Sequence, residues 1–264
     1  MIKFALLASG SKGNCCIVKD ENSSIIIDCG STKKYLTECF QRLQYDYKSS
    51  DALFVTHTHT DHILGVVWVV RMVAQAINSG KYSGELRVYG HAEAMQVLES
   101  ICRCTLPGKV CAHFAQDIHF VTLEDGGAFR AVGMEGLAFD IGSTKAKQYG
   151  FMLQLPGKMR LTCLGDEPYN PRAETYAYGA DWLLCEAFCL YEHRERFRPY
   201  EKHHSTAADA GRLAAMLQVK NLLLYHTEDR TLSTRRERYT AEAAASFCGA
   251  VHVPDDLEHI LLVP

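Results

Sequence analysis

Imidazole and carboxylate side chains are concentrated in the hexapeptide HTHTDH, which holds His57, His59, Asp61 and His62. In an extended segment, side chains two residues apart point the same way, so His57 and His59 can bind one metal ion together. Asp61 and His62 come at the predicted start of a helix, where they can serve a second ion. Imidazole and carboxylate suit zinc, iron or manganese, and a site without cysteine is not typical of structural zinc. The hexapeptide therefore predicts a catalytic metal site.

Two further candidate ligands stand at the ends of apolar segments elsewhere in the chain. Asp166 ends LTCLGD and His226 ends NLLLYH, just as HTHTDH follows the apolar DALFVT. For either residue alone, a capping or buried structural role is the alternative to metal binding. Sites in α/β folds gather at the carboxyl ends of strands, so the shared placement favours ligation. Asp166 is then in a position to bridge two ions.

The first half of the chain is predicted to form the strands and helices that position the hexapeptide. Short β-rich runs separated by the turn-forming clusters SGSKGN and DENS predict strands, and apolar residues at helical spacing predict helices. The segment after the hexapeptide is apolar on nearly all sides, which predicts a buried helix. We expect strands over 3–9, 15–20, 23–30, 51–56 and 85–90, and helices over 31–43, 63–78 and 91–101.

The second half repeats this order of elements. YGFMLQLPGKMRLTCLGDEP predicts strand, turn, strand and polar loop, while ADWLLCEA and VKNLLLYHT predict strands that end in polar residues. Between them STAADAGRLAAMLQ predicts a helix that begins with Thr206 and Asp209 in capping-box positions. Residues 110–140 suggest short antiparallel strands with a turn at EDGG. Because no Pro/Gly/Ser-rich linker divides the halves, we expect one α/β domain over 1–264, with sheet packed on sheet and helices outside.

Composition and charge restrict the partners. The 264 residues are 47% hydrophobic and 22% charged with a net charge of −3, which predicts a globular protein without a global basic field. The longest apolar run, 63–70, is shorter than the ~20 residues that span a bilayer, so we expect no membrane partner. Eleven cysteines without a CxxC pair favour reduced thiols and a cytoplasmic location. Two basic stretches, 194–202 and 230–238, are either solvated loops or phosphate-binding surfaces.

The motifs resemble a known family. HTHTDH is similar to the HxHxDH signature of the metallo-β-lactamase superfamily, LTCLGD and LLLYH resemble its later aspartate and histidine motifs, and LLASGSKGN with IIIDCG resembles its opening strands. The resemblance implies an α/β fold of the αβ/βα four-layer sandwich type with two similar halves. It also implies a metal-dependent hydrolase with one or two divalent ions, zinc first and manganese or iron as alternatives. The implied metal ligands are His57, His59, Asp61, His62, Asp166 and His226.

Within the superfamily, the chain most resembles ribonuclease Z and related phosphodiesterases. KHHSTAADAGRLAAMLQVKNLLLYHT is similar to a stretch in which His-Ser-Thr opens a helix before the last histidine strand, and LLCEAF resembles a strand that ends in a glutamate. The resemblance implies that His204 and Glu186 stabilise the transition state and handle protons. The implied substrate is a phosphodiester, nucleic acid included, attacked by a metal-bound hydroxide that Asp61 orients as it ligates.

The chain departs from the family pattern in the middle motif. The family has a histidine ahead of a Gly-Phe or Gly-Tyr strand, whereas AFDIGSTKAKQYGF places Gly142 where we align it. Asp140, His91 or water are the candidates to fill the position; otherwise the ion at His57 and His59 is held weakly. Two alternatives to the phosphodiesterase therefore stay open. One is an ester, thioester or lactone hydrolase of the same fold, and the other is a metal-binding protein with impaired catalysis.

Overall fold

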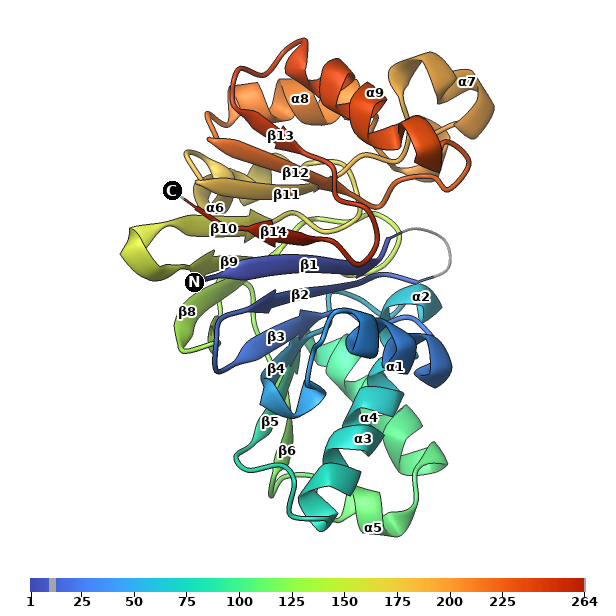
Figure 1. The fold of residues 1–264 in the computed structure, drawn as a ribbon, viewed down its shortest axis with the longest axis vertical. Helices are drawn as coiled ribbons and strands as arrows, with labels where there is room; N and C mark the ends of the chain where they lie inside the picture. Colours follow the sequence, from blue (N-terminus) through green and yellow to red (C-terminus); the bar gives the residue numbers. More distant parts are fainter. Residues whose placement is uncertain (10–12, 264) are drawn as a thin grey trace. The chain divides into compact units, whose positions relative to one another are not determined.

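The computed structural model describes residues 1–9 and 13–263, so part of the predicted SGSKGN turn lies outside the described residues. The chain forms two compact units, Met1–Glu135 with Asp256–Val263, and Gly136–Asp255. Each unit has its own sheet and helices (Figure 1). The first unit is coloured blue to green, apart from its dark red strand near the C-terminus, and the second is coloured yellow-green to red. The single domain over 1–264 stays a prediction.

The sheet of the first unit has the strand order β14-β1-β2-β3-β4-β5-β6. Neighbouring strands from β14 to β3 are antiparallel, and those from β3 to β6 are parallel. The strands are β1 (Lys3–Ala8), β2 (Cys15–Lys19), β3 (Ser24–Ile27), β4 (Ser50–Phe54), β5 (Leu86–Gly90), β6 (Ile118–Thr122) and β14 (His259–Leu261). The other elements of this unit are α1 (Lys33–Arg42), η1 (Tyr47–Ser49), α2 (Thr60–Ile63), α3 (Val66–Asn78), α4 (Ala92–Thr105), α5 (Gly108–Cys111) and β7 (Ala128–Ala131).

A single apolar cluster joins these helices to the sheet. Leu53 of β4 and Val88 of β5 belong to the same buried cluster as Phe40 of α1 and Val66 and Val70 of α3. The stretch that contains α2 and α3 is long and apolar enough to cross a membrane by composition, but 61% of it is buried inside the protein. The apolar side chains of this segment are therefore explained by packing in the core. A helix that is apolar on nearly all sides predicts such burial.

The second unit repeats this design. Its strands follow the order β13-β12-β11-β10-β9-β8, in which β10 to β13 are parallel and β8 to β10 are antiparallel. The strands are β8 (Met134–Asp140), in which the boundary between the units falls, β9 (Tyr149–Gln154), β10 (Arg160–Cys163), β11 (Trp182–Glu186), β12 (Asn221–Tyr225) and β13 (Ala250–His252). The helical elements are η2 (Pro156–Lys158), η3 (Pro171–Ala173), α6 (Glu174–Ala177), η4 (Tyr191–His193), α7 (Arg194–Phe197), η5 (Tyr200–Lys202), α8 (Ala207–Met216) and α9 (Leu232–Ala244).

Most predicted elements are confirmed, with one correction. Helix α8 begins with the expected capping box, in which Thr206 and Asp209 bond to each other's backbone N–H groups. The EDGG turn is present, since the Gly127 N–H donates to the Glu124 carbonyl (2.8 Å). The prediction of antiparallel strands in this region is wrong for β6, which pairs parallel to β5. Helix α4 makes that pairing possible because a parallel connection needs a crossover segment.

Candidate metal centre

The first ligand group, His57, His59, Asp61 and His62, lies just beyond the carboxyl end of β4. Ring nitrogens of His57 and His62 are within 4.8 Å of each other, close enough to bind one ion. The ring centroids are 4.0 Å apart for His57 and His62 and 4.5 Å apart for His57 and His59. Three of the four predicted residues are thus brought together by their rings, and the Asp61 carboxylate approaches His62 Nε2 at 3.7 Å.

Asp28, at the end of β3, orients the buried histidines. His62 Nδ1 lies 2.8 Å from Asp28 Oδ2, and Thr56 donates its N–H to Oδ1 (2.8 Å) and its hydroxyl to Oδ2 (2.7 Å). Because the Thr56 hydroxyl proton is given to Asp28, Thr56 Oγ1 accepts from His57 Nδ1 at 2.9 Å. Both histidines then carry their protons on Nδ1 and present Nε2 as a lone-pair donor. This donor set fits a divalent metal.

Asp28 is a candidate site residue that the sequence motifs did not bring out. Its segment, IIIDCG, was used only as part of the opening strands. The signal that identified Asp166 and His226, a polar residue directly after an apolar strand, also marks Asp28. Applied to every predicted strand, it would have found this residue.

Substitution of Asp28 by asparagine should weaken metal binding by roughly 10- to 100-fold. Three donors, the Thr56 N–H, the Thr56 hydroxyl and His62 Nδ1–H, converge on the carboxylate, so an amide NH2 must face one of them. Calorimetric titration of the metal-free protein with zinc measures the change. Asp46→Asn, a change at an exposed carboxylate that caps η1, is the matched control. Equal zinc affinity in Asp28→Asn and the parent would contradict the orienting role.

A glycine allows the hexapeptide loop to approach the end of β3. A Cβ atom on Gly30 would lie 1.5 Å from the Asp61 carbonyl oxygen. The same carbonyl accepts from the Asn14 N–H at 2.7 Å, and the Asn14 carbonyl accepts from the Gly30 N–H at 3.2 Å. The Asn14 side-chain nitrogen lies 2.9 Å from His62 Nε2, so this amide would have to turn away when His62 binds a metal ion through that nitrogen. The loop is therefore held in place by backbone contacts as well as by Asp28.

The second ligand group, Asp166 and His226, lies in the second unit. Asp166 follows β10 and His226 follows β12, and both are buried. Asp166 Oδ2 is 3.9 Å from His226 Nδ1, so the two side chains face each other as predicted from their strand ends. The Tyr225 hydroxyl donates to the Gly165 carbonyl and ties the two strand ends together. That the two ligand groups meet in one cleft stays a prediction.

His204 and Glu186 lie next to the second ligand group. His204 Nδ1 is 3.6 Å from Glu186 Oε2, and the His204 ring stacks on Phe188 and packs edge-on against His226, with ring centroids 5.0 Å apart for the two histidines. Glu186 is completely buried and accepts the Ser205 N–H. Burial raises the pKa of the Glu186 carboxyl, and His204 and Ser205 oppose that rise. The pair thus lies beside a predicted ligand, and its catalytic role stays a prediction.

The middle motif contacts Asp166 through Gln148, not through position 142. Gly142 has a left-handed φ of 70°, and a Cβ atom there would meet Asn170 Nδ2 at 2.7 Å. Asp140, one candidate for the position, accepts the Gly142 N–H at 2.8 Å. His91, the other, caps α4 in the first unit. By contrast, Gln148 Nε2 donates to Asp166 Oδ1, and Gln148 is buried.

The match to a family model shows which protein family the chain belongs to. The model described as the β-lactamase superfamily domain matches residues 23–227, which contain both ligand groups. The chain belongs to the metallo-β-lactamase superfamily. A solved member of this fold, YhfI from Bacillus subtilis, superposes with a TM-score of 0.76 at 18% identity and covers 99% of this chain and 100% of its own. This likeness confirms the predicted fold class.

Two curated relatives within the superfamily process nucleic acids according to their names. The exodeoxyribonuclease WalJ of Streptococcus pneumoniae is 30% identical over 94 residues, which is 32% of this chain and 35% of the relative. The chain therefore matches only about a third of that relative's length. Ribonuclease Z of Myxococcus xanthus is 25% identical over 291 aligned residues, which cover 88% of this chain and 89% of the relative.

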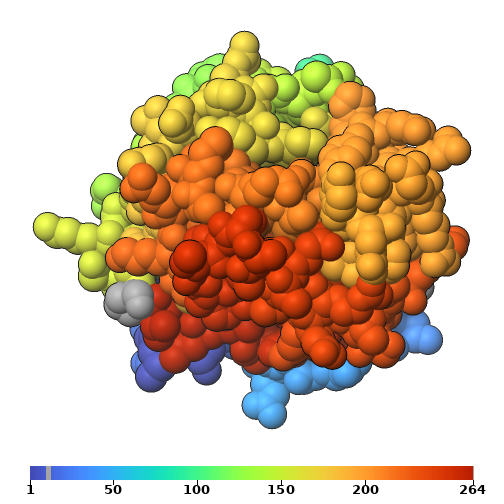
Figure 2. Space-filling view, turned by 90° about the horizontal axis from the view of Figure 1, so that it is seen from above, coloured from blue at the N-terminus to red at the C-terminus, as the bar shows by residue number. Residues whose placement is uncertain are grey.

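The two basic stretches are largely engaged in contacts within the second unit. They lie on α7 and α9, which form much of the face seen in orange and red in Figure 2. Arg235 is buried and bonds to Asp255 at 3.0 Å, where Arg236 pairs at 2.9 Å. Arg198 pairs with Glu201 at 3.4 Å. These contacts favour the interpretation as structural or solvated charges over phosphate binding.

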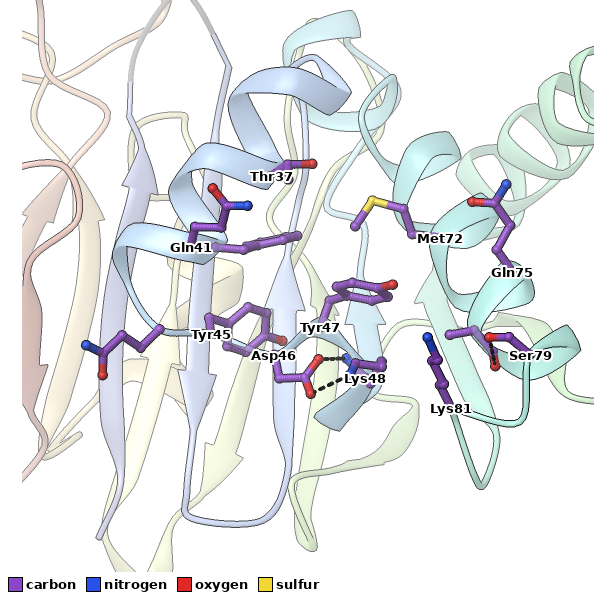
Figure 3. Close-up of a pocket in the computed structure, with 13 residues that line it drawn as sticks. Thr37, Gln41, Tyr45, Asp46, Tyr47, Lys48, Met72, Gln75, Ser79 and Lys81 are labelled. Atoms are coloured by element: carbon purple, nitrogen blue, oxygen red, sulfur yellow. Dashed lines mark hydrogen bonds and ion pairs between the residues drawn. The ribbon is translucent and has the colours of Figure 1, made fainter.

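Two cavities differ in their relation to the candidate ligands. One of about 590 Å³ lies between α1, η1 and the end of α3, near the amino end of β4 and thus away from the hexapeptide; it is lined by tyrosines, glutamines and lysines (Figure 3). The other, of about 360 Å³, is polar and lies at Gly142. Its lining includes the cations Lys147 and Arg172, and also Ser143, whose hydroxyl donates to Glu167, the residue after Asp166. The second cavity is the one connected to a candidate ligand.

Proposed function

We propose that the chain is a divalent-metal-dependent phosphodiesterase, with zinc as the first candidate metal. The observation that carries the proposal is the pair formed by His204 and the buried Glu186, directly beside His226. An imidazole in this position can donate to the non-bridging oxygens of a phosphodiester. The same donor would also stabilise the oxyanion formed from an ester, so the choice of a phosphodiester depends on the named relatives as well. The curated ribonuclease Z relative supports the same substrate class.

The proposal gives each residue a role. His57, His59, Asp61, His62, Asp166 and His226 hold the metal, which, when bound, acts as a Lewis acid and lowers the pKa of bound water. Asp61, whose side chain is 34% exposed, orients the attacking water and accepts its proton. His204 donates to a non-bridging phosphoryl oxygen, and the Glu186 carboxylate, 3.6 Å from Nδ1 of that ring, keeps the ring in place.

The substrate is proposed to be an anionic diester, nucleic acid included. Lys147 and Arg172 line the polar cavity at Gly142 together with one carboxylate, Asp140, and leave an excess of positive charge next to the segment that contacts Asp166. Positive charge lining a cleft raises the local concentration of an anionic substrate. A cytoplasmic enzyme is part of the same proposal, because the nucleic-acid substrates of the named relatives are consistent with that compartment.

Hydrolysis of bis(p-nitrophenyl) phosphate tests the proposal. The zinc-loaded protein should hydrolyse the diester, lose activity with a chelator and regain it when zinc is restored, because the chemistry requires the metal. A lactone and thioester panel measured in parallel is the control for the alternative hydrolase. Turnover of that panel without turnover of the diester would refute the phosphodiesterase. Tight zinc binding without turnover of either would identify a metal-binding protein with impaired catalysis.

A further inference from the structure

Both oxygens of the Asp166 carboxylate lie close to other side chains. Oδ1 accepts the amide N–H of Gln148, and Oδ2 lies 3.9 Å from Nδ1 of His226. Asp166 and Gln148 are both buried, so water does not readily replace the amide. The contact joins two segments 18 residues apart and lies wholly within the second unit.

The surroundings are shaped to hold the Gln148 amide. Gly165 has a φ of 80°, and a Cβ atom there would lie 3.1 Å from both Cδ and Oε1 of Gln148. Glycine at this position leaves room for the amide group beside Asp166. The Gln148 carbonyl also accepts the Ile141 N–H at 3.1 Å, which fixes the residue at the start of β9. The position of the Gln148 amide beside Asp166 is therefore fixed by the surrounding backbone.

An amide donor and a metal ion compete for the same region around Oδ1. A carboxylate that bridges two ions uses one oxygen for each, or shares one oxygen between them. The NH2 group of Gln148 carries partial positive charge and occupies the space beside Oδ1, so a cation there would be repelled and crowded. Oδ2, which faces His226, remains the oxygen suited to an ion. A bridge would have to share Oδ2 between two ions, so a second ion would be held more weakly than the first.

We propose that Gln148 makes Asp166 a ligand to one ion instead of a bridge between two, so that the chain holds one tightly bound metal. The proposal rests on the metal site assumed in the proposed function. It revises the expectation that Asp166 bridges, and it explains how the chain tolerates the loss of the middle-motif histidine. Gln148 is a positioning residue: it fixes the orientation of the carboxylate that binds the metal.

Metal stoichiometry tests this directly. Zinc content after equilibrium dialysis, measured by inductively coupled plasma mass spectrometry, should be one ion per chain for the parent. Gln148→His replaces the amide donor with a ligand and should bring the ratio to two. Gln154→His, at the far end of the strand that follows Gln148 and bonded to the Met159 carbonyl, is the matched control and should remain at one. Position 142 is unsuited to this test, because its left-handed φ and Asn170 oppose any side chain there.

Three results would overturn the proposal. They are two ions of equal affinity in the parent, a folded Gln148→His variant that still holds one ion, and a ratio of two in the Gln154→His control. If Gln148→His does not fold, Gln148→Ala replaces it: removal of the donor frees Oδ1, so a second, weaker ion should bind in a zinc titration, and its absence refutes the proposal. The readout is independent of turnover. A protein that holds one ion and hydrolyses no diester would refute the proposed function alone.

Discussion

Substitution of His204 by alanine should lower kcat for diester hydrolysis by about 10²-fold or more without changing the zinc content. A donor that acts mainly on the charge of the transition state affects kcat, and the loss of one such donor typically has this size. The His204 ring packs against His226 but is not among the proposed ligands, so the metal should stay bound. Turnover of bis(p-nitrophenyl) phosphate and metal analysis on the same samples measure both effects.

Two further substitutions separate catalysis from coordination. His226→Ala removes a proposed ligand and should lose or loosen zinc together with activity. His193→Ala removes a histidine of η4 that pairs with Glu192 at 3.5 Å, and it should change kcat by less than about threefold, as expected away from the chemistry. If His204→Ala retains the parent rate while His226→Ala is inactive, the result supports His226 as a metal ligand. The ribonuclease Z-like role of His204 would then be wrong.

The strand ends and helix starts that carry the candidate ligands could be predicted from the sequence, because short stretches of neighbouring residues encode them. An apolar run that ends in a polar residue predicted the strand ends at His57, Asp166 and His226, because strand alternation and burial are encoded in neighbouring residues. The long apolar helix after the hexapeptide and the capping box of α8 are local signals of the same kind. The superfamily signature then supplied the fold.

Contacts between distant segments could not be predicted in this way. Asp28 reaches His62 across 34 residues, and Gln148 reaches Asp166 across 18. Neither contact leaves a periodic pattern, since each depends on which strand ends become neighbours in the sheet. Alignment by motif alone therefore drew attention to Gly142, six residues from the side chain that contacts Asp166. The parallel pairing of β6 was missed for the same reason, since it depends on the path of the chain and not on the composition of the strand.

Substitution of Gly30 by alanine should displace the hexapeptide loop and destabilise the protein. The added Cβ would meet the Asp61 carbonyl oxygen at 1.5 Å and its carbonyl carbon at 1.9 Å, and backbone atoms cannot rotate away as a flexible side chain can. Overpacking of this kind costs about 3 kcal/mol or more, which for a protein of this size lowers Tm by roughly 10 °C. Thermal unfolding of the metal-free protein measures the change in stability.

The same substitution should weaken zinc binding at least tenfold, because the Asp61 backbone cannot move without displacing the histidines on either side of it. Gly108→Ala is the matched control, since a Cβ atom at Gly108 meets nothing within 4 Å and its φ is not left-handed. Alanine there, in the first turn of α5, should change stability by no more than about 0.5 kcal/mol and leave zinc affinity as it is. If Gly30→Ala matches Gly108→Ala in both measurements, the loop does not depend on the close approach at Gly30. The geometry of the first ligand group would then have to be maintained by Asp28 and Asn14 alone.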